Sequence, residues 1–200
     1  MGGRFLTLEG GEGAGKSTQG RQLVATLSKD GIPCLLTREP GGAPGSEVLR
    51  TILLQRPWDP LAELALHFAA RREHWARTIR PALEAGLWVV CDRFFDSTHA
   101  YQVGGQGADP GAFEAIRHAL LGDAAPDLTL LLDLPEGAGL ARARDANRYE
   151  ALGPAFHARV RAAFRARAAA EPARFVTLDA TEPRDAVTAA ALAAIRERLQ

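Results

Sequence analysis

The sequence contains neither a long apolar segment nor an excess of charge of one sign. In 200 residues, 24 lysines and arginines balance 24 aspartates and glutamates, so the formal net charge is zero. Balanced charge creates no overall field that would attract nucleic acid or an anionic membrane, so neither is an expected partner. A membrane-spanning helix needs about 20 apolar residues, and MGGRFLTLEG at the N-terminus lacks the apolar core of a signal peptide. We therefore expect a cytoplasmic protein.

Cysteine and lysine are scarce, with two residues of each. Cys34 and Cys91 lie in short apolar runs, where a free thiol behaves as a small buried hydrophobe; a disulfide or a catalytic thiol is the less favoured alternative. Almost every cation is an arginine, yet Lys16 occupies a glycine-rich segment. A compact ammonium fits among phosphate groups where a planar guanidinium does not.

Short apolar runs alternate with longer segments of helical character. The runs are continuously apolar, which is typical of strands buried on both faces. This pattern predicts an α/β fold in one domain, residues 1–200, with a five-stranded parallel sheet and helices on both faces. The predicted strands span residues 4–9, 33–37, 87–92, 128–133 and 174–179.

A phosphate-binding loop follows the first predicted strand. The segment GGEGAGKST, residues 10–18, matches the pattern G-x4-G-K-[ST] and precedes a predicted helix. Glycines let backbone N–H groups surround the phosphates, and the helix N-terminus adds partial positive charge. Lys16 is predicted to contact the outer phosphates of ATP, and the Ser17 hydroxyl to bind Mg²⁺. The loop residues expected to bind the nucleotide are Gly10, Gly11, Glu12, Gly13, Ala14, Gly15, Lys16, Ser17 and Thr18.

The rest of the chain narrows the class of nucleotide-binding protein. The GTPase patterns D-x-x-G and N-K-x-D do not occur, and 200 residues leave little room for the extra domain of a mechanical ATPase. A small-molecule kinase fits best. Arginines follow the second and third predicted strands in TREPGG (37–42) and DRFFDSTHAYQ (92–102). Because the carboxyl ends of parallel strands border the ligand crevice, Arg38 and Arg93 are expected to bind an acceptor phosphate there.

Several motifs in the same order resemble the thymidylate kinase family, over at least residues 5–150. They are EGGEGAGKST, TREPGG, HFAARRE, DRFFDSTHAYQ, PDLTLLLD and RARDANRYE. The resemblance implies a P-loop kinase fold that transfers a phosphoryl group from ATP to dTMP, giving dTDP for DNA synthesis. It also implies a homodimer.

The resemblance assigns roles around the acceptor. Phe68 matches an aromatic residue that stacks on thymine, and Arg72 an arginine that hydrogen-bonds the base. Thr98 matches a contact to the thymine edge, and Tyr101 a ring under the sugar that favours deoxyribose. Arg93 matches the acceptor-phosphate arginine. The full set expected to bind the acceptor is Glu12, Arg38, Phe68, Arg72, Asp92, Arg93, Ser97, Thr98, Tyr101 and Gln102, with Asp92 also a candidate metal ligand.

The loop acid and its neighbour predict where the catalytic charge lies. By resemblance, Glu12 recognises the 3′-hydroxyl of the acceptor. One class of the family carries a loop arginine after this acid, but here the residue is Gly13. The other class carries arginines on a flap, or LID, which we expect at about residues 141–153. Arg142, Arg144 and Arg148 are therefore predicted to be catalytic, with Lys16 and Arg93.

Two other functions remain open from the sequence. A nucleoside monophosphate is already largely ionised at neutral pH, since its second pKa is about 6, so its kinase needs no general base. A deoxynucleoside kinase does need one, and Glu39 would be the candidate. A nucleotide-dependent binding module would use the same loop without transferring phosphate.

Overall fold

The computed structural model describes residues 2–135, 137–139, 148–149 and 151–199. Its centre is a parallel sheet in the order β2-β3-β1-β4-β5. The strands are β1 (Phe5–Glu9), β2 (Cys34–Arg38), β3 (Trp88–Asp92), β4 (Leu128–Asp133) and β5 (Phe175–Asp179). The five predicted strands are confirmed to within one residue at each end.

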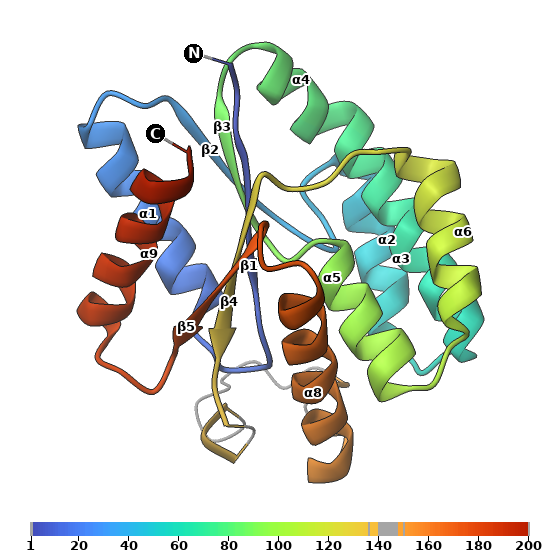
Figure 1. The fold of residues 1–200 in the computed structure, drawn as a ribbon. Helices are drawn as coiled ribbons and strands as arrows, with labels where there is room; N and C mark the ends of the chain where they lie inside the picture. Colours follow the sequence, from blue (N-terminus) through green and yellow to red (C-terminus); the bar gives the residue numbers. More distant parts are fainter. Residues whose placement is uncertain (1, 136, 140–147, 150, 200) are drawn as a thin grey trace.

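Helices cover both faces of the sheet (Figure 1). One face carries α1 (Lys16–Lys29) and α9 (Arg184–Leu199), which enclose an apolar cluster with the central strands. The other face carries a longer series of helical segments. These are α2 (Pro44–Gln55), α3 (Pro60–His74), η1 (Trp75–Ile79), α4 (Arg80–Glu84), α5 (Phe95–Thr98), η2 (His99–Gly105), α6 (Pro110–Leu121) and α8 (Pro154–Ala170).

The buried strands explain the continuously apolar runs in the sequence. In β4, Leu128, Leu130, Leu131 and Leu132 are at most 1% exposed, because helices cover the sheet on both sides. Burial of one such side chain contributes about 1.5–3 kcal/mol. In the described part of the chain α1, α4, α8 and α9 pack on the sheet, whereas α2 and α6 pack on other helices.

One segment differs from its predicted structure. Residues 92–102, expected to be a loop after the third strand, are mostly helical: α5 covers residues 95–98 and the π-helical η2 covers residues 99–105. The segment packs against α8 and α3, so tertiary contacts outweigh its weak helical pattern. This helix brings Ser97, Thr98, Tyr101 and Gln102 to one end of the sheet.

Neither cysteine forms a disulfide. Burial raises the pKa of both the Cys34 and the Cys91 thiols, so both remain protonated and unreactive near neutral pH. The structure agrees with the inert role predicted for them. No helix in the described residues is long and apolar enough to cross a membrane.

Candidate active site

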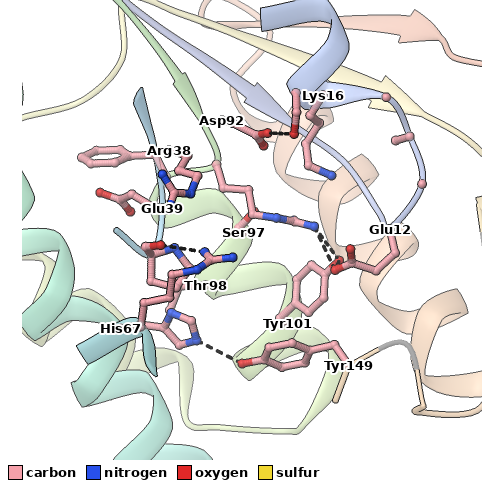
Figure 2. A pocket seen from close by; sticks show the side chains of 18 of the residues that line it. Glu12, Lys16, Arg38, Glu39, His67, Asp92, Ser97, Thr98, Tyr101 and Tyr149 are labelled. Carbon is pink, nitrogen blue, oxygen red and sulfur yellow. Dashed lines mark hydrogen bonds and ion pairs between the residues drawn. The ribbon is translucent and has the colours of Figure 1, made fainter. Parts of the chain in front are cut away.

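A cavity of about 890 Å³ opens at the carboxyl ends of β1, β2 and β3. The phosphate-binding loop forms one wall, and residues of α3, α5 and η2 form the opposite wall (Figure 2). Most of the residues predicted for the site line this cavity. They are Glu12, Gly13, Ala14, Gly15, Lys16, Ser17, Thr18, Arg38, Asp92, Arg93, Ser97, Thr98, Tyr101 and Gln102.

The loop backbone requires glycine at two positions, each with a positive φ and with a carbonyl oxygen where a Cβ would lie. Gly10 has φ 141°, and a Cβ there would lie 2.5 Å from the carbonyl oxygen of Leu132. Gly13 has φ 68°, and a Cβ there would overlap the carbonyl oxygen of Gly139. Any side chain at position 13 would therefore meet backbone, so this loop has no room for a cation at that position.

Lys16 is folded back on the loop that precedes it. Its Nζ donates to the carbonyl oxygens of Gly10 at 3.0 Å and Gly11 at 2.7 Å. Burial and the Arg93 charge lower the pKa of Lys16 to about 8, although Asp92, Glu12 and Glu9 oppose the shift. A bound anion would favour the charged ammonium.

A hydroxyl and a carboxylate meet at the start of α1. Ser17 Oγ donates to Asp92 Oδ2 at 2.5 Å. Both oxygens are hard ligands of the kind Mg²⁺ prefers, and Mg²⁺ commonly takes one or two protein oxygens together with phosphates and water. No cluster of three His, Cys, Asp or Glu side chains suitable for a metal occurs in the described residues. The donor set therefore fits an ion that enters with a nucleotide.

Arg93 is the central side chain of the cavity floor. Its Nη1 donates to Gly10 O at 3.1 Å and Ser97 Oγ at 3.0 Å. Its Nη2 donates to Glu12 Oε1 at 2.9 Å and to the Tyr101 hydroxyl at 3.2 Å, and Tyr101 donates to the same Glu12 oxygen at 2.8 Å. Arg93 has φ 72°, a strained value for a non-glycine residue. The surrounding contacts hold this conformation.

Glu12 in this cluster and the buried Glu9 beside it have opposite pKa shifts. Burial raises the pKa of Glu12, but the charges of Arg93 and Lys16 and the hydrogen bond from Tyr101 outweigh it and lower the pKa to about 2. Burial and the charge of Asp96 raise the pKa of Glu9 to about 8. Glu9 accepts from Ser97 Oγ and the Phe94 amide, and so supports the turn that carries Arg93.

A second arginine enters the cavity from α3. Arg71 is 2% exposed, and its Nε donates to Glu39 Oε2 at 2.7 Å while its Nη2 donates to Thr98 Oγ1 at 3.0 Å. Its buried Nη1 makes no hydrogen bond to the described residues. A charged donor in a cavity wall whose Nη1 amino group is unused is suited to a ligand oxygen.

The chain matches the thymidylate kinase family model over residues 8–191. It is 48% identical to a thymidylate kinase of Bradyrhizobium sp. (strain ORS 278), with 98% of this chain and 91% of the relative covered. It is 50% identical to that of Magnetococcus marinus, covering 94% and 93%. The chain belongs to the thymidylate kinase family.

A solved structure supports the same assignment for the fold. The crystal structure of thymidylate kinase from Ehrlichia chaffeensis matches with a TM-score of 0.81 at 33% identity, covering 98% of this chain and 99% of the other. The chain is therefore a kinase with a P-loop kinase fold, as the sequence predicted.

On α3, the residues that line the cavity are each one position earlier in the sequence than those predicted to bind the base. Phe68 is fully buried and packs edge-on against Phe113, and Arg72 donates to the Leu120 carbonyl at 3.1 Å; neither lines the cavity. His67 and Arg71 line it instead. A helix turns by 100° per residue, so the pair 67/71 shares a face that the pair 68/72 does not. The predicted roles of Phe68 and Arg72 are therefore wrong in this structure.

Phe68 still contributes to the site indirectly. The Arg71 guanidinium lies 4.9 Å from the Phe68 ring centroid and 5.2 Å from that of Phe94. The two rings support the flat guanidinium from within the core.

Of the three arginines predicted on the flap, the structure describes one. Arg142 and Arg144 lie outside the described residues. Arg148 does not line the cavity: it contacts Glu63 Oε2 at 2.5 Å and donates to the Leu53 carbonyl at 3.0 Å. The catalytic role predicted for Arg148 conflicts with this placement, because a buried acid already holds its guanidinium.

Sequence reasoning missed several residues of the cavity wall. His67 and Tyr149 line it and lie within the motifs HFAARRE and RARDANRYE, but no role was predicted for either, and Arg50 lies outside every motif. Arg38, predicted to hold a phosphate, lies at the wall and pairs with Glu47 at 3.1 Å. Only the packing of α2 and α3 beside the loop places Arg50 and His67 there.

The low pKa of Glu12 predicts a pH-dependent contribution to stability. The folded-state pKa of about 2 lies below the ordinary 4.5, so the carboxylate stabilises the fold above about pH 4.5 and this contribution is lost as the pH falls toward 2. At about 1.4 kcal/mol per pKa unit it amounts to about 3 kcal/mol. We expect the difference in unfolding free energy between wild type and Glu12→Gln to shrink below about pH 5.

Urea unfolding across this pH range measures the difference. Glu84→Gln, at an exposed glutamate that forms an i,i+4 pair with Arg80, serves as the control and should change little with pH. A pH-independent difference for Glu12→Gln would contradict the pairing with Arg93.

Proposed function

We propose that the protein transfers the terminal phosphoryl group of ATP to dTMP, giving dTDP. The single observation that carries this proposal is that two cationic groups, Lys16 and Arg93, line one cavity together with Glu12. Lys16 belongs to the loop that binds the donor phosphates. Arg93 lies on the acceptor side, within reach of Tyr101 and Ser97.

In this proposal the residues act by alignment and by neutralising charge. The dTMP phosphate supplies an oxygen that is already ionised, so no side chain needs to remove a proton. Ser17 and Asp92 would hold Mg²⁺ with the ATP phosphates, and the ion would supply positive charge to the transferring group. Glu12 would face the sugar of the acceptor. Arg142 and Arg144 are the proposed cations of the flap. The flap is proposed to be part of a single domain that contains the whole chain.

Arg71 and His67 are the proposed residues for the base. The unused Nη1 of Arg71 is a donor for a carbonyl oxygen of thymine, and His67, four residues earlier on the same face, supplies a flat ring. Thr98 is fixed by Arg71 and completes this wall.

Glu39 is poorly placed to act as the general base of a deoxynucleoside kinase. It is 5% exposed, and its two carboxylate oxygens contact Arg71 Nε and His74 Nδ1 at 2.7 and 3.0 Å. An acid engaged at both oxygens has little freedom to take a proton from a sugar hydroxyl. The geometry favours the monophosphate acceptor.

The acceptor preference is testable with ATP, Mg²⁺ and a panel of acceptors. We expect ADP release with dTMP and none above background with thymidine. Lys16→Met should lower kcat/KM with dTMP at least about a thousandfold, since it removes the charge on the donor phosphates. Turnover of thymidine but not dTMP would replace this proposal with a deoxynucleoside kinase. Tight ATP binding without acceptor-dependent turnover would instead indicate a binding module.

Two adjacent arginines provide a matched test of the base site. Arg71→Met should raise the KM for dTMP about 10- to 100-fold, the effect of losing a charged hydrogen bond. Arg72→Met, which loses a bond to a backbone carbonyl outside the cavity, should leave KM within about threefold. The reverse ranking would restore the original assignment to Phe68 and Arg72.

We further propose a homodimer formed through α2 and α3, in the cytoplasm where the nucleotide substrates are found. Val48 is 61% exposed, Leu61 47% and Ile52 36%, an unusual set of apolar side chains on two neighbouring helices. A second copy of the chain would cover them.

Size-exclusion chromatography with light scattering tests this proposal. We expect a dimer for the wild type and a monomer for Val48→Asp, because the charge would be buried in the interface. Ala189→Asp, at an exposed position on α9 on the opposite face of the sheet, is the control and should remain dimeric. A monomeric wild type would reject the proposal.

A further inference from the structure

A buried acid with no role in the proposed reaction lies behind the cavity wall. Glu63, in the first turn of α3, is fully buried. Its Oε1 accepts from Gln102 Nε2 at 2.8 Å, Gln106 Nε2 at 2.9 Å and the Tyr149 hydroxyl at 2.7 Å. Its Oε2 contacts Arg148 Nη2 at 2.5 Å. One carboxylate thus joins α3, η2 and residues 148–149.

The Tyr149 hydroxyl connects this acid to the cavity. Tyr149 lines the cavity, and its oxygen lies 3.1 Å from Nε2 of His67, another lining residue (Figure 2). The same oxygen also accepts from Arg148 Nη2 at 2.8 Å and, over a longer distance, from Gln102 Nε2 at 3.3 Å. The side chain therefore stands between the buried acid and the ring proposed to face the base.

The direction of these hydrogen bonds follows from counting protons. Tyr149 has one hydroxyl proton, and an ionised carboxylate can only accept, so this proton goes to Glu63. Arg148 beside Glu63 favours the ionised carboxylate. The bond between His67 and Tyr149 must then be donated by His67, which places a proton on Nε2. In the neutral imidazole Nδ1 is left with its lone pair.

Burial and the surrounding positive charges keep His67 neutral. Burial, followed by the charges of Arg71, Arg148 and Arg93, lowers the pKa of His67 to about 3. These cations come from α3, from the segment before α8 and from the turn after β3. The acid that accepts from Tyr149, Glu63, is paired with Arg148. His67 can thus lie beside Arg71 without adding a second positive charge.

We propose that Glu63 and Tyr149 are positioning residues that fix the ring orientation and the Nε2–H tautomer of His67 in the acceptor pocket. This inference rests on the proposed function for the role of the pocket, but the tautomer itself does not. Tyr149 fixes the ring directly, and Glu63 acts through Tyr149. A ring held in one orientation presents a flat surface without losing rotamer entropy when the acceptor binds.

The hydrogen-bond chain from Glu63 through Tyr149 to His67, here called the relay, also explains why Arg148 does not line the cavity. Its Nη2 contacts both Glu63 and the Tyr149 hydroxyl, and its guanidinium carbon lies 4.2 Å from the Tyr149 ring centroid. Arg148 neutralises the buried acid, and without it Glu63 would be an unpaired buried charge.

Nitrogen NMR of the wild-type protein labelled in its histidines tests the tautomer without any substrate. His67→Phe identifies the His67 signals by their loss. We expect Nε2 protonated and Nδ1 unprotonated, with no titration from about pH 5 to about pH 8, where an ordinary histidine titrates. Tyr149→Phe should produce a mixture of tautomers. Glu63→Gln retains an acceptor oxygen for Tyr149 and should preserve the wild-type tautomer.

Steady-state kinetics tests the positioning role. Tyr149→Phe should raise the KM for dTMP about 3- to 10-fold and leave kcat within about twofold, since Lys16 and Arg93 are untouched. Thr7→Val is the matched control: it removes another fully buried hydroxyl, hydrogen-bonded to Thr129 at 2.9 Å and outside the cavity. It should leave both constants unchanged.

A wild-type His67 that is protonated on Nδ1, or that titrates near pH 6.5, would overturn the relay. So would a Tyr149→Phe variant with unchanged tautomer and unchanged KM. Absence of dTMP turnover in the wild type would refute the proposed function instead, and the NMR result would still decide the tautomer.

Discussion

Three carboxylates at or behind the cavity wall, two of them buried, are each paired with an arginine and determine the shape of the cavity. Glu12 pairs with Arg93, Glu39 with Arg71 and Glu63 with Arg148. A charge removed from water is costly unless it is paired and hydrogen-bonded, and leaving one member of a buried pair without its partner costs about 3–5 kcal/mol. Each arginine is therefore restricted to one orientation, and the pairs fix the walls before any ligand arrives.

This arrangement suits a reaction that depends on alignment rather than on proton transfer. The groups that carry positive charge are already oriented, so little reorganisation is needed when phosphates bind. Lys16 rests on the carbonyls of Gly10 and Gly11, and the Arg71 Nη1 has no partner among the described residues. These are the donors that the proposed substrates would use.

Local sequence patterns predicted the sheet and the phosphate loop because both are encoded by adjacent residues. The continuously apolar strands and the G-x4-G-K-[ST] spacing need no knowledge of distant contacts. The α3 assignment failed because HFAARR satisfies the four-residue spacing in two frames, 67/71 and 68/72. Only the packing of Phe68 against Phe113 decides between them. Likewise, no local pattern relates Glu63 to Arg148 and Tyr149, which are far apart in the chain.

The central claim is that a cavity built from these pairs holds dTMP between Arg93 and the wall formed by His67 and Arg71. A crystal structure of the complex with dTMP tests it most directly. The account predicts Arg71 Nη1 within hydrogen-bond distance of a thymine oxygen, Arg93 beside the phosphate, and the Arg72 guanidinium still on the Leu120 carbonyl. A thymine ring bound against Phe68 and Arg72, or outside the cavity, would contradict it.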